Sequence, residues 1–192
     1  MPKKKPAPPP SPLVRPVAEA DFTAIQSIYA HHVLHGLASF EEVAPGIAEM
    51  RRRADEVLAR GLPFVVAVLE GSVVAYGYCS PYRARSAYRH VLEDSVYVRD
   101  GLQGCGLGRA VLAVLIERCE ALGYRQLIAV IGDSANMGSI GLHAALGFIR
   151  VGTLRSVGWK FGRWIDSVYM QRPLGTGDGT PPLEKAATPP AK

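Results

Sequence analysis

The chain has 192 residues, nearly half of them apolar, and a formal net charge of +5. This length and composition fit one globular domain with a substantial core and exclude a disordered or fibrous chain. No apolar run approaches the ~20 residues of a membrane span, and the lysines at 3–5 are too small a cluster for nucleic acid, so we expect neither partner.

The first 12 residues contain six prolines and a lysine cluster, a composition that disfavours both helix and central strand. Residues 175–192 are rich in Gly, Thr, Pro and Ala. We therefore expect disordered tails at 1–12 and 175–192, and a folded domain at 13–174.

Hydrophobic periodicity within this domain predicts alternating strands and helices. Asp21 is a candidate cap for the first helix, and Glu70-Gly71-Ser72 is typical of a hairpin turn. The order predicts an α/β protein with a mixed sheet and helices on both faces. The expected strands are 13–17, 64–69, 73–78, 92–98, 126–131, 148–155 and 164–172. The expected helices are one that follows Asp21, with Phe22, Ile25, Ile28 and Tyr29 on its apolar face, then 47–60, one that runs from the glycine segment to Leu122, and 139–146.

The segment Gln103-Gly104-Cys105-Gly106-Leu107-Gly108-Arg109 lies between a strand and an amphipathic helix. Glycines let backbone N–H groups converge at a helix N-terminus, which makes a nest for phosphate. A side chain at Gly106 is expected to crowd this nest. The chain has no Lys-Ser or Lys-Thr for a P-loop, and its glycine spacing does not fit a dinucleotide fold. A plain glycine turn capping a core helix is the structural alternative.

The same segment fits Gln/Arg-x-x-Gly-x-Gly/Ala, and residues 136–148 fit Asn-x-x-Ala/Ser-x-x-Leu-Tyr/His-x-x-x-Gly-Phe. Both motifs, in this order, resemble the GNAT N-acetyltransferases. The resemblance implies the GNAT acyl-CoA N-acyltransferase fold with a mostly antiparallel sheet, acetyl-CoA as co-substrate and no metal. It implies that acetyl-CoA is bound by Val96, Tyr97, Val98, Gln103, Gly104, Cys105, Gly106, Leu107, Gly108, Arg109, Asn136 and Ser139.

Segments at 81–88, 93–98, 129–132 and 158–166 are similar to the phosphinothricin N-acetyltransferase subfamily, which includes methionine sulfoximine and methionine sulfone acetyltransferases. The resemblance covers the whole expected domain and implies a small amino-acid-like acceptor. Arginine forks suit its anionic groups. The implied acceptor-binding residues are Phe40, Arg83, Arg85, Tyr88, Glu93, Asp94 and Ser95.

Glu93 is the expected general base, acting directly or through water, and His143 the expected second catalytic residue. The structural alternatives are a surface acid and a core histidine. Because side chains alternate along a strand, Asp94 should point to the opposite face, where it needs a partner that the sequence does not identify.

His31, His32 and His35 have no acidic partner of the zincin type and are expected at the surface or the end of the helix. Trp159 and Trp164 favour a homodimer interface. The number of cysteines is odd, and the N-terminal sequence has no recognisable secretory signal. Both observations favour a cytoplasmic protein with reduced thiols. The alternatives are acetylation of another amine (a peptide N-terminus or a polyamine), a non-catalytic acyl-CoA-binding protein, and a nucleic-acid binder resting on the lysine tail alone.

Overall fold

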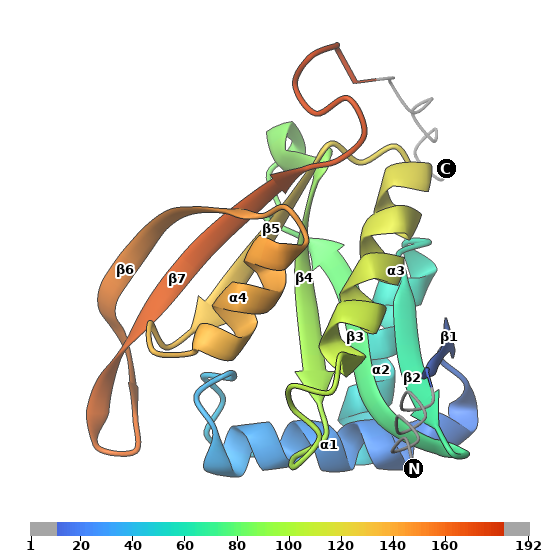
Figure 1. Ribbon diagram of the computed structural model, residues 1–192, viewed down its shortest axis with the longest axis vertical. Helices are drawn as coiled ribbons and strands as arrows, with labels where there is room; N and C mark the ends of the chain where they lie inside the picture. The colour runs from blue at the N-terminus through green and yellow to red at the C-terminus, as the bar shows by residue number, and fades with distance from the viewer. Residues whose placement is uncertain (1–10, 183–192) are drawn as a thin grey trace, which may run out of the picture.

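A computed structural model describes residues 11–182, and its seven strands form one sheet in the order β1-β2-β3-β4-β5-β7-β6 (Figure 1). Every neighbouring pair is antiparallel except β4 and β5. The predicted mixed, mostly antiparallel sheet is therefore confirmed. The strands are β1 (Leu13–Pro16), β2 (Phe64–Leu69), β3 (Ser72–Pro81), β4 (Val91–Val98), β5 (Gln126–Gly132), β6 (Ile149–Lys160) and β7 (Arg163–Pro173).

Helices cover both faces of the sheet, with α3 and α4 on one side and α1 and α2 on the other (Figure 1). Apolar side chains of both layers are buried against the strands. The contact between α3 and β3 depends on Gly77, where a Cβ would lie 2.7 Å from a methyl group of Val111. The helices are α1 (Phe22–His35), α2 (Ile47–Ala59), α3 (Leu107–Ala121) and α4 (Met137–Ala145), with 3-10 turns η1 (Glu19–Asp21) and η2 (Ser86–Tyr88).

Asp21 precedes α1, as predicted, but its carboxylate does not cap the helix. It accepts hydrogen bonds of 2.6 and 2.8 Å from the Arg15 guanidinium and one of 2.7 Å from the Ala18 N–H. The predicted cap was wrong because a bidentate arginine partner on β1 competes for the same oxygens.

The last two strands form a longer hairpin than predicted. We expected strands at 148–155 and 164–172, but β6 continues to Lys160 and β7 begins at Arg163. Phe161 and Gly162 have φ values of 50° and 71°, the positive pair that a tight hairpin turn needs. The hairpin projects from the rest of the molecule (Figure 1).

The residues after Leu174, the last residue of the expected domain, were assigned to a tail from sequence but begin against the fold. Leu174 is fully buried, and Arg125 donates hydrogen bonds to the carbonyl oxygens of Gly177 (2.7 Å) and Thr180 (2.5 Å). The rest of that tail and residues 1–10 lie outside the described range. None of the helices within 11–182 combines the length and apolarity that a membrane crossing needs.

The parallel pair β4–β5 is short, and it positions the site. Its register runs only from Val91–Gln126 to Asp94–Ala129, whereas β4 continues to Val98. Beyond Asp94 the two strands diverge. The sheet therefore contains a splay at its centre, bordered by the last four residues of β4.

Candidate active site

The glycine segment forms the turn between β4 and α3. Gly101, Gly104 and Gly106 have φ values of 78°, 77° and 80°, in the left-handed region that other residues disfavour. Gly106 is the residue immediately before α3, whose first turn carries no acidic residue. A helix N-terminus with converging N–H groups and no carboxylate attracts phosphate oxygens.

A Cβ at Gly104 or Gly106 would meet no atom within 4 Å. A side chain at Gly106 would therefore meet no protein atom and would project into open space, so the expected crowding of a bound phosphate stays a prediction. The backbone conformation, rather than lack of space, requires glycine there.

A cavity of about 360 Å³ lies between this turn, the end of β4 and the start of α4. We call it the glycine-loop cavity. Gly108 lets α3 approach α4, since a Cβ there would lie 3.1 Å from Leu142. Of the residues predicted to bind acetyl-CoA, its lining contains Val96, Val98, Gln103, Gly104, Gly106, Gly108, Arg109, Asn136 and Ser139.

Three residues predicted to bind acetyl-CoA do not line this cavity. Cys105 is exposed, and the buried Leu107 belongs to the core. The ring of Tyr97 points to the opposite side of β4, where it stacks on Tyr76 at 5.2 Å between ring centroids. Their backbone groups remain available, so only the side-chain part of the expectation changes.

His32 is a lining residue that the sequence did not indicate. It was expected at the surface or the end of the helix, and it lies in the last turn of α1. Its Nε2 is 2.8 Å from the Val98 carbonyl oxygen, and burial lowers its pKa. His31 lies 3.6 Å from Asp100 and packs against His35. The interaction with Val98 attaches α1 to the end of β4.

A second, larger cavity of about 710 Å³ lies on the other side of β4, and we call it the Glu93 cavity. Because side chains alternate along a strand, Glu93, Ser95 and Tyr97 all face it. Its remaining walls come from the loop after α1, from β3 and from β5 to β7. They are Ala38, Ser39, Phe40, Glu41, Tyr78, Val130, Gly132, Leu154, Val157, Ser167 and Tyr169.

A third cavity, of about 50 Å³, lies in the splay. It shares Ser95 and Val130 with the Glu93 cavity, and Val96 and Asn136 with the glycine-loop cavity. The splay therefore lies between the two larger cavities, where a ligand from each side can meet.

Glu93 is half-buried in its cavity. Burial raises its pKa to about 7, and the negative charge of the neighbouring Asp94 adds to the rise. A carboxyl group with such a pKa is partly ionised near neutral pH, which suits a general base.

Asp94 points away from the Glu93 cavity, as the alternation predicts, and its partner is His143. The Asp94 Oδ2 and His143 Nε2 atoms are 3.0 Å apart, and the two side chains are 1% and 5% exposed. The Asp94 Oδ1 atom has no hydrogen-bond partner among the described residues. Asp94 does not line the Glu93 cavity but lines the small cavity in the splay, so its part in acceptor binding stays a prediction.

His143 uses both ring nitrogens in contacts with the protein. Nδ1 lies 2.8 Å from the Ser139 carbonyl oxygen, which can only accept, so Nδ1 carries the proton. Burial lowers the pKa of His143, but Asp94 and the Ser139 carbonyl outweigh it and leave the pKa raised. The geometry favours an imidazolium held by Asp94 rather than a ring with a free N–H.

Asn136 occupies the N-cap of α4, where its side-chain oxygen accepts from the Ser139 N–H at 3.1 Å. The cap also places Asn136 in the glycine-loop cavity. Asn136 can therefore cap α4 and contact acetyl-CoA from the same position.

The loop after α1 forms one wall of the Glu93 cavity and is held from β6. The buried Lys160 ammonium donates to the carbonyl oxygens of Gly36 (3.0 Å) and Ser39 (2.7 Å). The Phe40 ring fills the space beside two glycines, since a Cβ would lie 3.0 Å from it at Gly132 and 2.6 Å at Gly158. The structure thus places Phe40 in the cavity wall.

Arg83, Arg85 and Tyr88 lie in the connection between β3 and β4 and do not line the cavity. Both arginines are exposed. The Arg83 guanidinium lies over the ring of Tyr82 at 5.1 Å and interacts electrostatically with Tyr169, a residue of the cavity wall. Their role in acceptor binding stays a prediction, with Arg83 placed toward the rim.

The model of the acetyltransferase (GNAT) family matches residues 30–148. The chain belongs to the GNAT acetyltransferase family. The matched range includes the glycine segment, Glu93 and His143, so the family assignment and the two cavities concern the same residues.

Among GNAT relatives, a phosphinothricin N-acetyltransferase from Alcaligenes faecalis is 57% identical over 169 residues, covering 88% of this chain and 86% of that protein. An L-methionine sulfoximine/L-methionine sulfone acetyltransferase from Pseudomonas paraeruginosa is 38% identical over 159 residues, covering 82% and 92%. A GNAT phosphinothricin acetyltransferase from Sinorhizobium meliloti, solved in complex with AcCoA, has a TM-score of 0.89 and 45% identity, covering 93% of this chain and 96% of that one.

Proposed function

We propose that this GNAT protein is an N-acetyltransferase that moves the acetyl group of acetyl-CoA to the α-amine of a small amino-acid-like acceptor. The observation that carries the proposal is the position of Glu93. It faces a large cavity and is separated by the splay from a phosphate nest on the other side of the same strand. Similarity to acetyltransferases acting on phosphinothricin and methionine sulfoximine supports this acceptor class.

The glycine-loop cavity fits acetyl-CoA. Three left-handed glycines and the acid-free start of α3 provide the phosphate nest, and Arg109 adds a positive charge. The end of β4, unpaired with β5 beyond Asp94, offers peptide groups to the amides of the pantetheine arm. When bound, acetyl-CoA supplies an activated acetyl thioester.

Glu93, as a carboxylate, takes a proton from the acceptor ammonium directly or through a water molecule. The neutral amine then has the lone pair needed to attack the acetyl carbon. We assign polarisation of the acetyl oxygen to a backbone N–H within Val96–Val98. After the attack the nitrogen releases its second proton, directly or through water, to the sulfur, and CoA leaves as the thiol beside the splay, where the His143 imidazolium is paired with Asp94.

A diamine or polyamine is the second candidate acceptor. Glu41 and Glu93 both line the Glu93 cavity, whereas neither Lys nor Arg is among its described lining residues. A peptide N-terminus or a non-catalytic acyl-CoA-binding role has no comparable support from these contacts.

A turnover screen with acetyl-CoA tests the proposal, using phosphinothricin, methionine sulfoximine, methionine sulfone, common amino acids and polyamines as acceptors. We expect α-amino acids of the first three kinds to be acetylated, with kcat/KM rising as pH increases through about 7, the pKa of Glu93. The Glu93→Gln variant should turn over ~100-fold more slowly while still binding acetyl-CoA. Unchanged turnover in that variant would remove Glu93 from the reaction.

We also propose a homodimer. Trp159 and Trp164 pack edge to face at 5.1 Å on the projecting β6–β7 hairpin and remain 56% and 63% exposed. Val157 and Phe161 extend this apolar surface, at 52% and 57% exposed. A second copy of the chain would cover it. Light scattering should give twice the chain mass, and Trp164→Asp should lower it.

We further propose a cytoplasmic location, on the basis of the cysteines. The buried Sγ atoms of Cys79 and Cys119 lie 3.4 Å apart without a bond between them. Unjoined thiols at this distance fit a reducing compartment. Fractionation of cells with an antibody against the protein tests the location.

A further inference from the structure

Glu41 is a second carboxylate of the Glu93 cavity, contributed by the loop after α1. Burial raises the pKa of the wall residue Tyr78, the Ser95 hydrogen bond and the Arg53 guanidinium lower it, and the charges of Glu93 and Glu41 both add to the rise. Both acids therefore act on the same part of the cavity. The described lining contains no cation that would neutralise them from inside.

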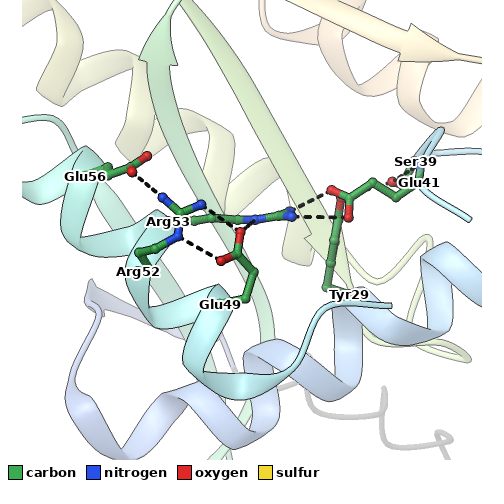
Figure 2. Close-up of polar contacts among 7 residues, drawn as sticks. All are labelled: Tyr29, Ser39, Glu41, Glu49, Arg52, Arg53 and Glu56. Carbon is green, nitrogen blue, oxygen red and sulfur yellow. Dashed lines mark hydrogen bonds and ion pairs between the residues drawn. The ribbon is translucent and has the colours of Figure 1, made fainter. Parts of the chain in front are cut away.

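The Glu41 carboxylate is fixed from outside the cavity (Figure 2). Its Oε1 atom accepts from the Tyr29 hydroxyl at 2.8 Å and from Arg53 Nη1 at 2.6 Å. The Ser39 hydroxyl lies 3.0 Å from the Tyr29 oxygen and accepts from the Glu41 N–H at 3.1 Å. Since Tyr29 donates its proton to Glu41, Ser39 must donate to Tyr29, which closes a ring of hydrogen bonds.

Arg53 is shared between two acids, so it only partly neutralises Glu41. Its Nε donates to Glu49 at 2.8 Å, and Glu49 also accepts from Arg52, which reaches Glu56 (Figure 2). Three carboxylates face two guanidiniums in this cluster, and the Lys160 ammonium on β6 adds a positive charge that reaches Glu41 from the other side of the loop. The Glu41 Oε2 atom accepts one bond of 3.3 Å among the described residues and keeps capacity for another donor.

We propose that Glu41 recognises the ammonium group of the acceptor and holds the cationic form in the cavity before Glu93 removes its proton. This inference rests on the proposed acetyl transfer and adds a specificity-determining residue to it. An amine arrives protonated at neutral pH, so a fixed carboxylate beside the base favours its entry over that of a neutral analogue.

A purely structural role for Glu41 would make it a latch for the loop. The loop, however, has an independent attachment through Lys160 and through the Phe40 ring. Gln at position 41 can still accept from Tyr29 and Arg53, because its amide oxygen replaces one carboxylate oxygen. The Glu41→Gln change therefore removes the charge while keeping most of the contacts.

The test compares an amine with its uncharged analogue. The acceptor is methionine sulfone, and the analogue is the corresponding 2-hydroxy acid, which has a hydroxyl in place of the ammonium. In Glu41→Gln we expect the acceptor KM to rise about tenfold with kcat within about threefold, while the inhibition constant of the hydroxy acid stays within about twofold. The exposed neighbour Glu42, changed to Gln, is the matched control and should leave all three values unchanged.

Binding is also measured by calorimetry in the presence of CoA without its acetyl group, where no transfer occurs. The result for Glu41 then does not depend on turnover, so absence of activity in the wild type would count against the proposed function alone. Equal weakening of the amine and the hydroxy acid in Glu41→Gln would show a latch and overturn the inference, as would an unchanged acceptor affinity. A Tyr29→Phe variant keeps the charge and should change acceptor affinity less than about threefold.

Discussion

Replacement of Glu93 by Gln should stabilise the protein above neutral pH. The pKa of this carboxyl group rises from a usual value of 4.5 to about 7 in the fold, chiefly through burial. The folded protein therefore holds a proton that the unfolded chain has already released, and stability is lost as pH rises from 4.5 to 7. The difference corresponds to about 3 kcal/mol of unfolding free energy at pH 8, since each pH unit is worth about 1.4 kcal/mol.

Urea denaturation of the wild type and Glu93→Gln at pH 4.5 and pH 8 measures this effect. We expect the variant to gain about 3 kcal/mol on the wild type between these two pH values, with the same m-value. Glu117→Gln, at an exposed position on α3, is the control for loss of a carboxylate. A pH dependence equal in the wild type and Glu93→Gln would refute the desolvation of Glu93, and with it the physical basis for its role as a base near pH 7.

Three further substitutions test other parts of the site. Asp94→Asn removes the partner of His143, whose pKa is raised in the fold, and should lower the unfolding free energy by about 3 kcal/mol. The loss should be larger at pH 6, where the histidine is charged, than at pH 9. A loss that does not depend on pH contradicts the ion pair with His143. Gly106→Val should weaken acetyl-CoA binding more than Gly106→Asn does, because Asn tolerates the positive φ of this position. Calorimetry that gives equal affinities for both variants would show that the backbone conformation is not what requires glycine there. Lys160→Met leaves the carbonyl oxygens of Gly36 and Ser39 without their donor. The unfolding free energy should fall by about 1–3 kcal/mol, and the acceptor KM should rise. A Tm and KM like those of the wild type disprove the attachment of the loop to Lys160.

The sequence predicts the order of elements because their signals are local. Alternation, helical periodicity and the glycines at 71 and 106 each act within a few residues. The same locality explains the error at the final hairpin. The bulky residues around Phe161–Gly162 are not typical of a tight turn, so the sequence does not indicate one there, and the predicted end of β6 at residue 155 is too early.

The candidate site was predictable where a residue lies in a motif, and not where distant residues meet. Glu93 follows from its place in the strand before the glycine loop. The partner of Asp94 is 49 residues away, and Lys160 reaches a loop more than 120 residues earlier in the chain. Glu41 carries no motif of its own, and its place in the cavity depends on Tyr29 and Arg53 from two helices.

The two cavities share Ala38 and the strand β4, but most of their other walls come from different parts of the chain, so the two sites can change separately. Phe40, Leu154, Val157 and Tyr169 line the Glu93 cavity and are not among the residues of the glycine-loop cavity. A library restricted to these four positions should therefore yield enzymes with altered amine preference and an unaltered affinity for acetyl-CoA. Because the splay separates the two sides of the sheet, the acceptor site can change in sequence while the acetyl-CoA site stays the same.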